Sequence, residues 1–94
     1  MSPLTFEWDP RKAAANLRKH RVSFEEALTA FRDPLAKIHS DPDHSVGERR
    51  EILVGHSAQG RLLIVAFTER RKRVRLFSAR LATRRERQDY EEGT

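Results

Sequence analysis

The sequence predicts an α+β fold in which an antiparallel β-sheet meander is covered by helices. Three observations support this prediction: two capped helical segments come early, three β-rich segments follow with connections of about three to four residues, and another capping signal precedes a last helix. Strands and helices that are grouped along the chain are typical of α+β domains. The expected order is β-α-α-β-β-β-β-α, within one domain of residues 1–94 that has no internal repeat.

The first expected strand, Leu4–Trp8, is short and aromatic and is followed by an Asp9-Pro10 pair. Asp is a favoured N-cap, and Pro at the first helical position lacks only an N–H group that would be unpaired there anyway. A helix is therefore expected from Pro10 to about Lys19.

The second helix has clearer signals. Ser23 and Glu26 form a capping box, and the residues beyond Ser23 repeat in the i, i+3, i+4, i+7 pattern of an apolar helix face: Phe24, Ala27, Leu28 and Phe31. The helix is expected to end at the Asp33-Pro34 pair, because a residue before proline is disfavoured in the helical conformation.

The remaining strands follow one another closely. After a short strand at residues 35–39 and a polar loop at residues 40–47, strands are expected at residues 49–56, 62–68 and 74–79. The middle segment, LLIVAFT, is apolar on both faces, which is typical of a central strand.

The last helix is predicted by a second capping box, formed by Thr83 and Glu86. It is expected from Arg84 to about Glu92. The helices are expected to cover one face of the sheet.

Positive charge is concentrated towards the end of the chain. Residues 61–87 hold ten Arg and Lys against two Glu, which is +8, so the rest of the chain sums to −3 of the net +5. A basic face of this kind binds a polyanion, most often nucleic acid.

Some classes of protein are not expected. The chain has no cysteine, and no apolar run approaches the roughly 18 to 20 residues that span a bilayer, so a soluble cytoplasmic protein without a membrane partner is predicted. One loop region holds His39, Asp41, Asp43 and His44, but no further spaced ligand set accompanies them. Neither a metal nor another cofactor is therefore expected.

Several separated segments resemble the BrnT family of bacterial toxins: FEWDPRKAAANLRKHRVSFEEALTAF, DPLA, DPDHS, ERREILVGHS and FSARLATRRERQDYE. The resemblance covers nearly the whole chain, with the segments in the family's order. It implies a RelE-like ribonuclease fold, an RNA-cutting activity that inhibits translation, and neutralisation by a BrnA antitoxin. It also implies a two-plus-two toxin–antitoxin complex that contacts operator DNA through the antitoxin.

RNA can be cut without a metal when its own 2′-hydroxyl attacks the neighbouring phosphate. Arginine stabilises the added negative charge, and His, Glu, Lys or Tyr can serve as acid and base. With a hairpin turn at residues 71–72, Arg70 opposes Arg73, and Arg80 opposes Leu63. At about 3.3 Å per residue, Arg70 and Arg80 are then over 20 Å apart along the hairpin. The two ends of this hairpin are therefore separate candidate sites.

The end that holds His56, Arg61, Arg80 and the start of the last helix is the expected active site. Resemblance to RelE-like nucleases implies that Arg61, Arg80 and Tyr90 occupy the catalytic positions. His56 is either an acid or base or an ordinary polar residue at a strand end.

The other end of the hairpin carries Glu69, Arg70, Arg73 and Arg75. It is either an RNA-binding surface, with Glu69 joining a second catalytic set if a bulge bends the hairpin, or a solvated charged turn. In the last helix, the candidate phosphate contacts are Arg84 and Arg85, which are equally suited to a solvated helix surface.

Three classes of function follow. A toxin that cuts RNA is the leading one, and a non-catalytic RNA-binding or other nucleic-acid-binding module is the alternative, because a basic face predicts both. A transcriptional regulator would need a basic recognition helix, which the helical pair between Asp9 and Phe31 lacks.

Overall fold

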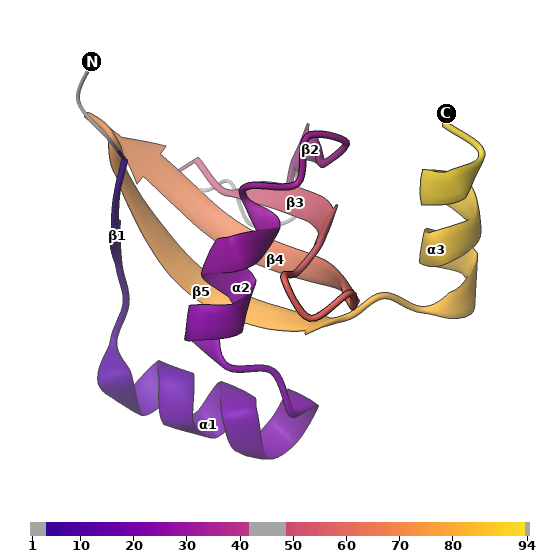
Figure 1. Ribbon diagram of the computed structural model, residues 1–94. Helices are drawn as coiled ribbons and strands as arrows, with labels where there is room; N and C mark the ends of the chain where they lie inside the picture. Colours follow the sequence, from indigo (N-terminus) through magenta and orange to yellow (C-terminus); the bar gives the residue numbers. More distant parts are fainter. Residues whose placement is uncertain (1–3, 42–48, 94) are drawn as a thin grey trace.

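The computed structural model describes residues 4–41 and 49–93, and in these ranges the predicted order of elements is confirmed (Figure 1). The helices are α1 (Pro10–His20), α2 (Phe24–Ala30) and α3 (Arg84–Glu91). The strands are β1 (Thr5–Glu7), β2 (Lys37–Ser40), β3 (Glu51–His56), β4 (Leu62–Arg70) and β5 (Arg73–Leu81).

All five strands form one sheet in the order β1-β5-β4-β3-β2. Strands β2 to β5 are an antiparallel meander with β4 in the centre, as predicted, but β1 runs parallel to β5. The sheet is therefore mixed, and the prediction of a purely antiparallel sheet is wrong at this edge. No hairpin joins β1 to β5, so no turn forces the two strands to be antiparallel. In the parallel register Phe6 lies beside Val74, and both pack into the core.

The two faces of the sheet are covered differently. Helices α1 and α2 lie on one face, over a core that includes Phe24, Leu53, Val65 and Phe67. Helix α3 lies on the opposite face, where a smaller apolar cluster forms around Val54, Leu62 and Ile64, with Ala82 and Tyr90 packed against it (Figure 1). The expectation that the helices cover one face is therefore wrong for α3, because alternate residues of β4 are apolar towards both sides.

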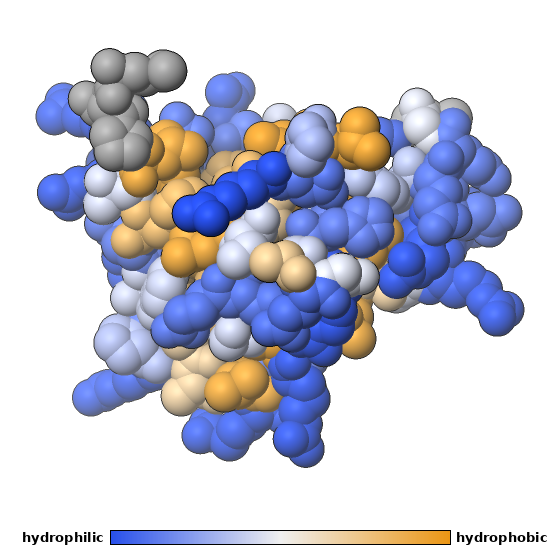
Figure 2. All heavy atoms as spheres, in the orientation of Figure 1, coloured by the Kyte–Doolittle hydropathy of each residue, from blue (hydrophilic) through white to orange (hydrophobic). Residues whose placement is uncertain are grey.

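Helix α3 is more exposed than the other two helices. None of its residues is buried, and Figure 2 shows hydrophilic side chains over it. None of the helices in the described ranges is long and apolar enough to cross a membrane.

A β-bulge at Phe77 decides which face Arg80 occupies. Ala66 pairs with Ser78, but Phe67 pairs with Leu76, so Phe77 is an extra residue in β5. Arg70 opposes Arg73 as predicted, whereas the bulge moves Arg80 from the expected Leu63 to Ile64. Without the extra residue, strict alternation from Leu76 would turn Arg80 towards the α1 and α2 core. With it, Arg80 lies on the α3 face.

Candidate active site

A pocket of about 460 Å³ lies between α3 and the strands β2, β3 and β4, and we call it the α3 groove. Its floor is apolar and its walls are polar. The residues that line it are Lys37, His39, Ile52, Val54, Ile64, Glu86, Asp89 and Tyr90. The groove thus combines an apolar base with ammonium, imidazole, carboxylate and phenol groups.

Arg80 reaches the groove through Glu86. Its guanidinium donates two hydrogen bonds to the carboxylate, from Nη1 to Oε1 at 2.8 Å and from Nη2 to Oε2 at 2.9 Å. The same carboxylate accepts from the Thr83 N–H, which completes the predicted capping box of α3. The hydrogen bonds from Arg80 lower the pKa of Glu86 to about 2, although burial opposes the shift. Arg80 is therefore held at the groove by a carboxylate that stays ionised near neutral pH.

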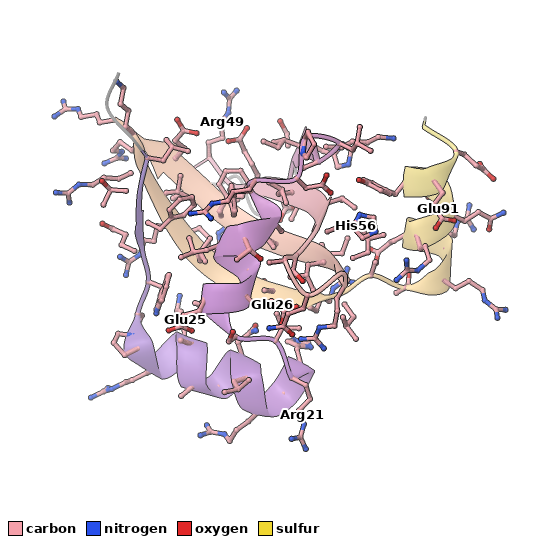
Figure 3. The ribbon with its side chains drawn as sticks, in the orientation of Figure 1. Arg21, Glu25, Glu26, Arg49, His56 and Glu91 are labelled. Atoms are coloured by element: carbon pink, nitrogen blue, oxygen red, sulfur yellow. The ribbon has the colours of Figure 1, made fainter. Side chains whose placement is uncertain are left out.

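Tyr90 and His56 meet at Asp33. Asp33 Oδ2 accepts hydrogen bonds from the His56 N–H at 2.7 Å and from the Tyr90 hydroxyl at 3.1 Å, and His56 Nδ1 lies 3.4 Å from it. The two rings are in edge contact, with 5.4 Å between their centroids, and Figure 3 shows His56 between β3 and α3.

These contacts set the ionisation of Asp33 and Tyr90. Burial would raise the pKa of Asp33, but hydrogen bonds from His56, Leu35 and Tyr90 together lower it below 3.8. Burial and the bond to Asp33 raise the pKa of Tyr90 above 10.0. Asp33 is thus an anion and Tyr90 a proton donor at neutral pH.

A glycine allows Asp33 to approach β3. A Cβ atom on Gly55 would lie 3.0 Å from both the Ala30 carbonyl oxygen and the Ala36 Cβ, so a larger residue would push the end of α2 away from the strand. This close approach places Asp33 beside His56.

Three residues of this region were missed as catalytic candidates by sequence reasoning. Asp33 was identified only as a helix stop, and its pairing with the distant Tyr90 left no local signal. His39 was considered only as a metal ligand. Lys37, whose Nζ lies 3.4 Å from the Tyr90 carbonyl oxygen and 5.5 Å from the centroid of its ring, was not singled out.

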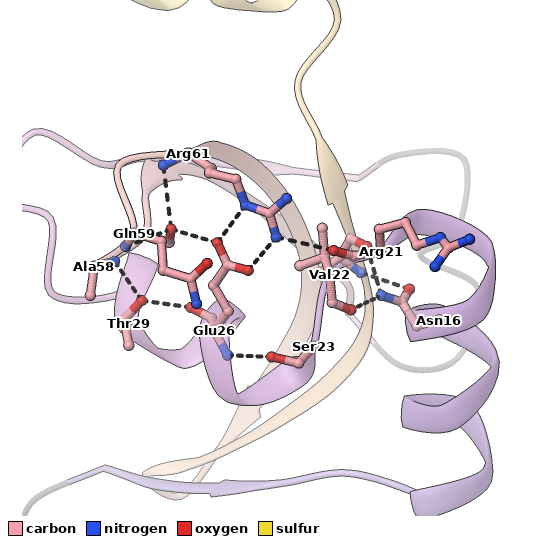
Figure 4. Close-up of polar contacts among 11 residues, drawn as sticks. Asn16, Arg21, Val22, Ser23, Glu26, Thr29, Ala58, Gln59 and Arg61 are labelled. Atoms are coloured by element: carbon pink, nitrogen blue, oxygen red, sulfur yellow. Dashed lines mark hydrogen bonds and ion pairs between the residues drawn. The ribbon is translucent and has the colours of Figure 1, made fainter.

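Arg61, in contrast, lies on the other side of the sheet from Arg80. Its guanidinium pairs with Glu26 of α2, with 2.9 Å between Nε and Oε2, and also donates to the Arg21 carbonyl oxygen (Figure 4). Ser57 donates a further hydrogen bond to Glu26. The hydrogen bond from Arg61 lowers the pKa of Glu26 against the effect of burial. The structure therefore does not bring Arg61 together with Arg80 and Tyr90.

The far end of the β4–β5 hairpin forms a second pocket, of about 500 Å³, which we call the arginine pocket. It is lined by Glu7, Thr68, Arg70, Arg71, Arg73 and Arg75. Glu69 lies between Thr68 and Arg70 on β4, so its side chain points to the other face. Of the remaining candidates, Arg84 and Arg85 are exposed in the first turn of α3.

The candidate metal ligands are only partly described. Asp43 and His44 lie outside the described residues, and His39 lines the α3 groove. In residues 4–41 and 49–93, no group of three or more His, Asp or Glu residues is placed to hold a metal ion.

Comparisons with known proteins define the class. The chain is similar to the crystal structure of the Brucella abortus ribonuclease toxin BrnT, with a TM-score of 0.61 and 21% identity over 86% of this chain and 99% of that chain. That likeness shows a shared fold. A search of curated proteins finds no match. Residues 8–86 match the family described as the ribonuclease toxin, BrnT, of type II toxin-antitoxin systems. The chain belongs to this BrnT family of ribonuclease toxins, and the resemblance seen in the sequence is confirmed.

Proposed function

We propose that this protein is a metal-independent endoribonuclease toxin that cuts RNA in the α3 groove and thereby inhibits translation. One observation carries the proposal: Arg80 reaches, through Glu86, a groove lined by Lys37, His39 and Tyr90. These groups supply a charge stabiliser, a general base and a general acid within one site. Membership of a ribonuclease toxin family supports the same reaction.

In the proposed mechanism, the RNA phosphate takes the place of the Glu86 carboxylate on the Arg80 fork. A carboxylate and a phosphate present similar pairs of oxygens to a guanidinium, so the exchange keeps the geometry of the hydrogen bonds. His39 accepts the proton of the 2′-hydroxyl as it attacks the phosphorus, and the Lys37 ammonium adds positive charge beside the phosphate. Tyr90, which is protonated at neutral pH, gives a proton to the 5′-oxygen that leaves. The products are a cyclic phosphate and a 5′-hydroxyl.

The test is RNA cleavage by the purified protein in EDTA. Activity should persist, because the proposed charge stabiliser is an arginine. Complete loss of cleavage that magnesium restores would reject the metal-free mechanism. RNA binding without cleavage in either condition would favour the alternative function, a non-catalytic RNA-binding module, which the basic arginine pocket also supports.

We further propose that the fold is RelE-like and that the toxin acts in the cytoplasm until a BrnA-like antitoxin covers it. A two-plus-two complex, with operator DNA bound through the antitoxin, is expected. An acidic or amphipathic antitoxin segment would complement the basic face and block access of RNA. Co-expression of the two proteins should restore growth, and light scattering should show a complex larger than a one-to-one pair. A neighbouring gene product that neither copurifies nor restores growth would argue against this partner.

A further inference from the structure

We infer that the arginine pocket is a second RNA site, which anchors the backbone phosphates of a single-stranded substrate away from the α3 groove. This inference rests on the proposed ribonuclease function. It adds that the RNA substrate must be long enough to contact both pockets.

The two pockets share one face of the sheet. Phe6 and Val74 pair with each other and point into the α1 and α2 core, so their neighbours Glu7, Arg73 and Arg75 point to the opposite face. Thr68 pairs with Arg75, and Ile64 of the same strand lines the α3 groove. Thr68 and Ile64 are four residues apart on β4 and therefore point to the same side.

The sheet between the two pockets carries small residues beside one aromatic–arginine contact. Ala66 of β4 pairs with Ser78 of β5, midway between the arginine pocket and the α3 groove, and the Arg50 guanidinium lies 4.2 Å from the centroid of the adjacent Phe77 ring. On β5, Arg73 and Arg80 are about 20 Å apart at about 3.3 Å per residue. One extended RNA strand of several nucleotides can therefore contact both pockets across this face.

The charge of the pocket favours a polyanion. Arg73 and Arg75 share the single carboxylate of Glu7, at 3.6 and 3.0 Å. Within the described part of the chain, Arg70 and Arg71 make no ion pair. A pocket with four arginines and one carboxylate keeps a positive charge that phosphates can neutralise.

The backbone of the hairpin turn is strained at two basic residues. Arg71 and Lys72 form the two-residue turn of the hairpin, and both have positive φ, at 52° and 68°. Such turns favour Asn-Gly or Asp-Gly, because other side chains are strained in the left-handed region. Two long basic residues are therefore held here at a cost in local strain, which is typical of a functional position.

RNA rather than an acidic protein segment is the favoured ligand, because the pocket continues the face that carries the α3 groove. Arg73 and Arg75 are two residues apart on one strand, so they point the same way at a spacing of about 6.6 Å, which suits successive phosphates along a single strand.

The experiment compares Arg70→Gln/Arg71→Gln with Arg18→Gln/Lys19→Gln. The control pair removes the same charge from exposed positions at the end of α1, away from the pocket. Binding is measured by fluorescence anisotropy with 2′-O-methyl RNA of about 4 and about 16 nucleotides, which resists cleavage, over a range of salt concentrations.

The pocket variant should bind the longer RNA about tenfold more weakly, and its plot of log affinity against log salt should be shallower by about 1.4, or 0.7 for each lost phosphate contact. Its affinity for the short RNA, which cannot reach both pockets at once, should fall by a clearly smaller factor. The control pair should bind both RNAs like the wild type. Circular dichroism checks that both variants fold.

Equal losses of affinity for the longer RNA in the two variants would overturn the inference. So would an unchanged slope of log affinity against log salt in the pocket variant. Neither result would affect RNA cleavage by the wild type. Loss of antitoxin binding with unchanged RNA binding would assign the pocket to the partner and also overturn it. A wild type that binds RNA through the pocket but cleaves none would support the second site and remove the ribonuclease proposal.

Discussion

Two arginines in this protein each pair with a glutamate, but on opposite faces of the sheet and with different exposure. Glu26, the partner of Arg61, has a side chain that is 3% exposed, whereas Glu86, the partner of Arg80, is 35% exposed. Arg61 also bonds the Arg21 carbonyl oxygen, and Ser57 further fixes Glu26. The side chains of Arg61 and Arg80 are themselves partly exposed, at 34% and 39%.

The difference lies in what happens when each pair opens. Separation of Arg61 from Glu26 would leave a buried carboxylate with Ser57 as its remaining side-chain partner, which is costly. Separation of Arg80 from Glu86 leaves a carboxylate that water can reach and that still accepts a hydrogen bond from Thr83. Arg80 can therefore release its glutamate to bind a phosphate at a lower cost than Arg61 can.

The largest expected effect is on catalysis by Arg80. Arg80→Ala should lower kcat/KM for RNA by about a hundredfold or more, because it removes the group that stabilises charge in the transition state. Toxicity should be lost in a growth assay at matched expression. Arg80→Lys should recover only part of the activity, since an ammonium lacks the planar fork.

The control for Arg80 is Arg87→Ala, which removes an exposed charge from α3, the helix that carries the Glu86 partner of Arg80. It should stay within a few-fold of the wild type. An Arg80→Ala protein that folds by circular dichroism and remains as toxic as Arg87→Ala would remove Arg80 from the active site.

The second effect is on stability at Arg61. Resemblance to RelE-like nucleases implied a catalytic role for this residue, but its contacts favour a structural one. Arg61→Ala should lower the melting temperature by several degrees, because Glu26 is left buried without its cation, while kcat/KM of the remaining folded protein stays close to wild type.

The double variant Arg61→Met/Glu26→Leu separates the two roles. Apolar residues of similar size can replace a buried ion pair, so the double variant should recover most of the lost stability and retain ribonuclease activity. A double variant that is stable but inactive would return Arg61 to the catalytic machinery.

The sequence predicted the elements well because their signals are local. The caps at Asp9, Ser23 and Thr83 and the apolar run of β4 each depend on a few neighbouring residues. The hairpin turn was also placed correctly, since Arg70 does oppose Arg73.

The features that were missed depend on contacts between distant segments. The direction of β1 is set by its packing against β5, which is far away in the chain. The bulge at Phe77 changes the face of Arg80 without any Gly or Pro to mark it. The Asp33–Tyr90 bond joins residues 57 positions apart. Site geometry therefore followed from register and helix placement, which residue types alone do not specify.

The smallest expected effect is in the hairpin turn, where stability and binding should change in opposite directions. Arg71→Asn/Lys72→Gly places residues that tolerate positive φ at both turn positions, so the free energy of unfolding in urea should rise by about 1 kcal/mol. RNA binding should weaken, because two cations are lost from the turn. The control, Arg71→Gln/Lys72→Gln, removes the same charges but keeps both strained side chains, and it measures how much of the gain comes from relief of charge repulsion. An equal gain in the free energy of unfolding in both variants would mean that backbone strain contributes nothing. Arg71 and Lys72 would then occupy the turn at no cost in stability from positive φ.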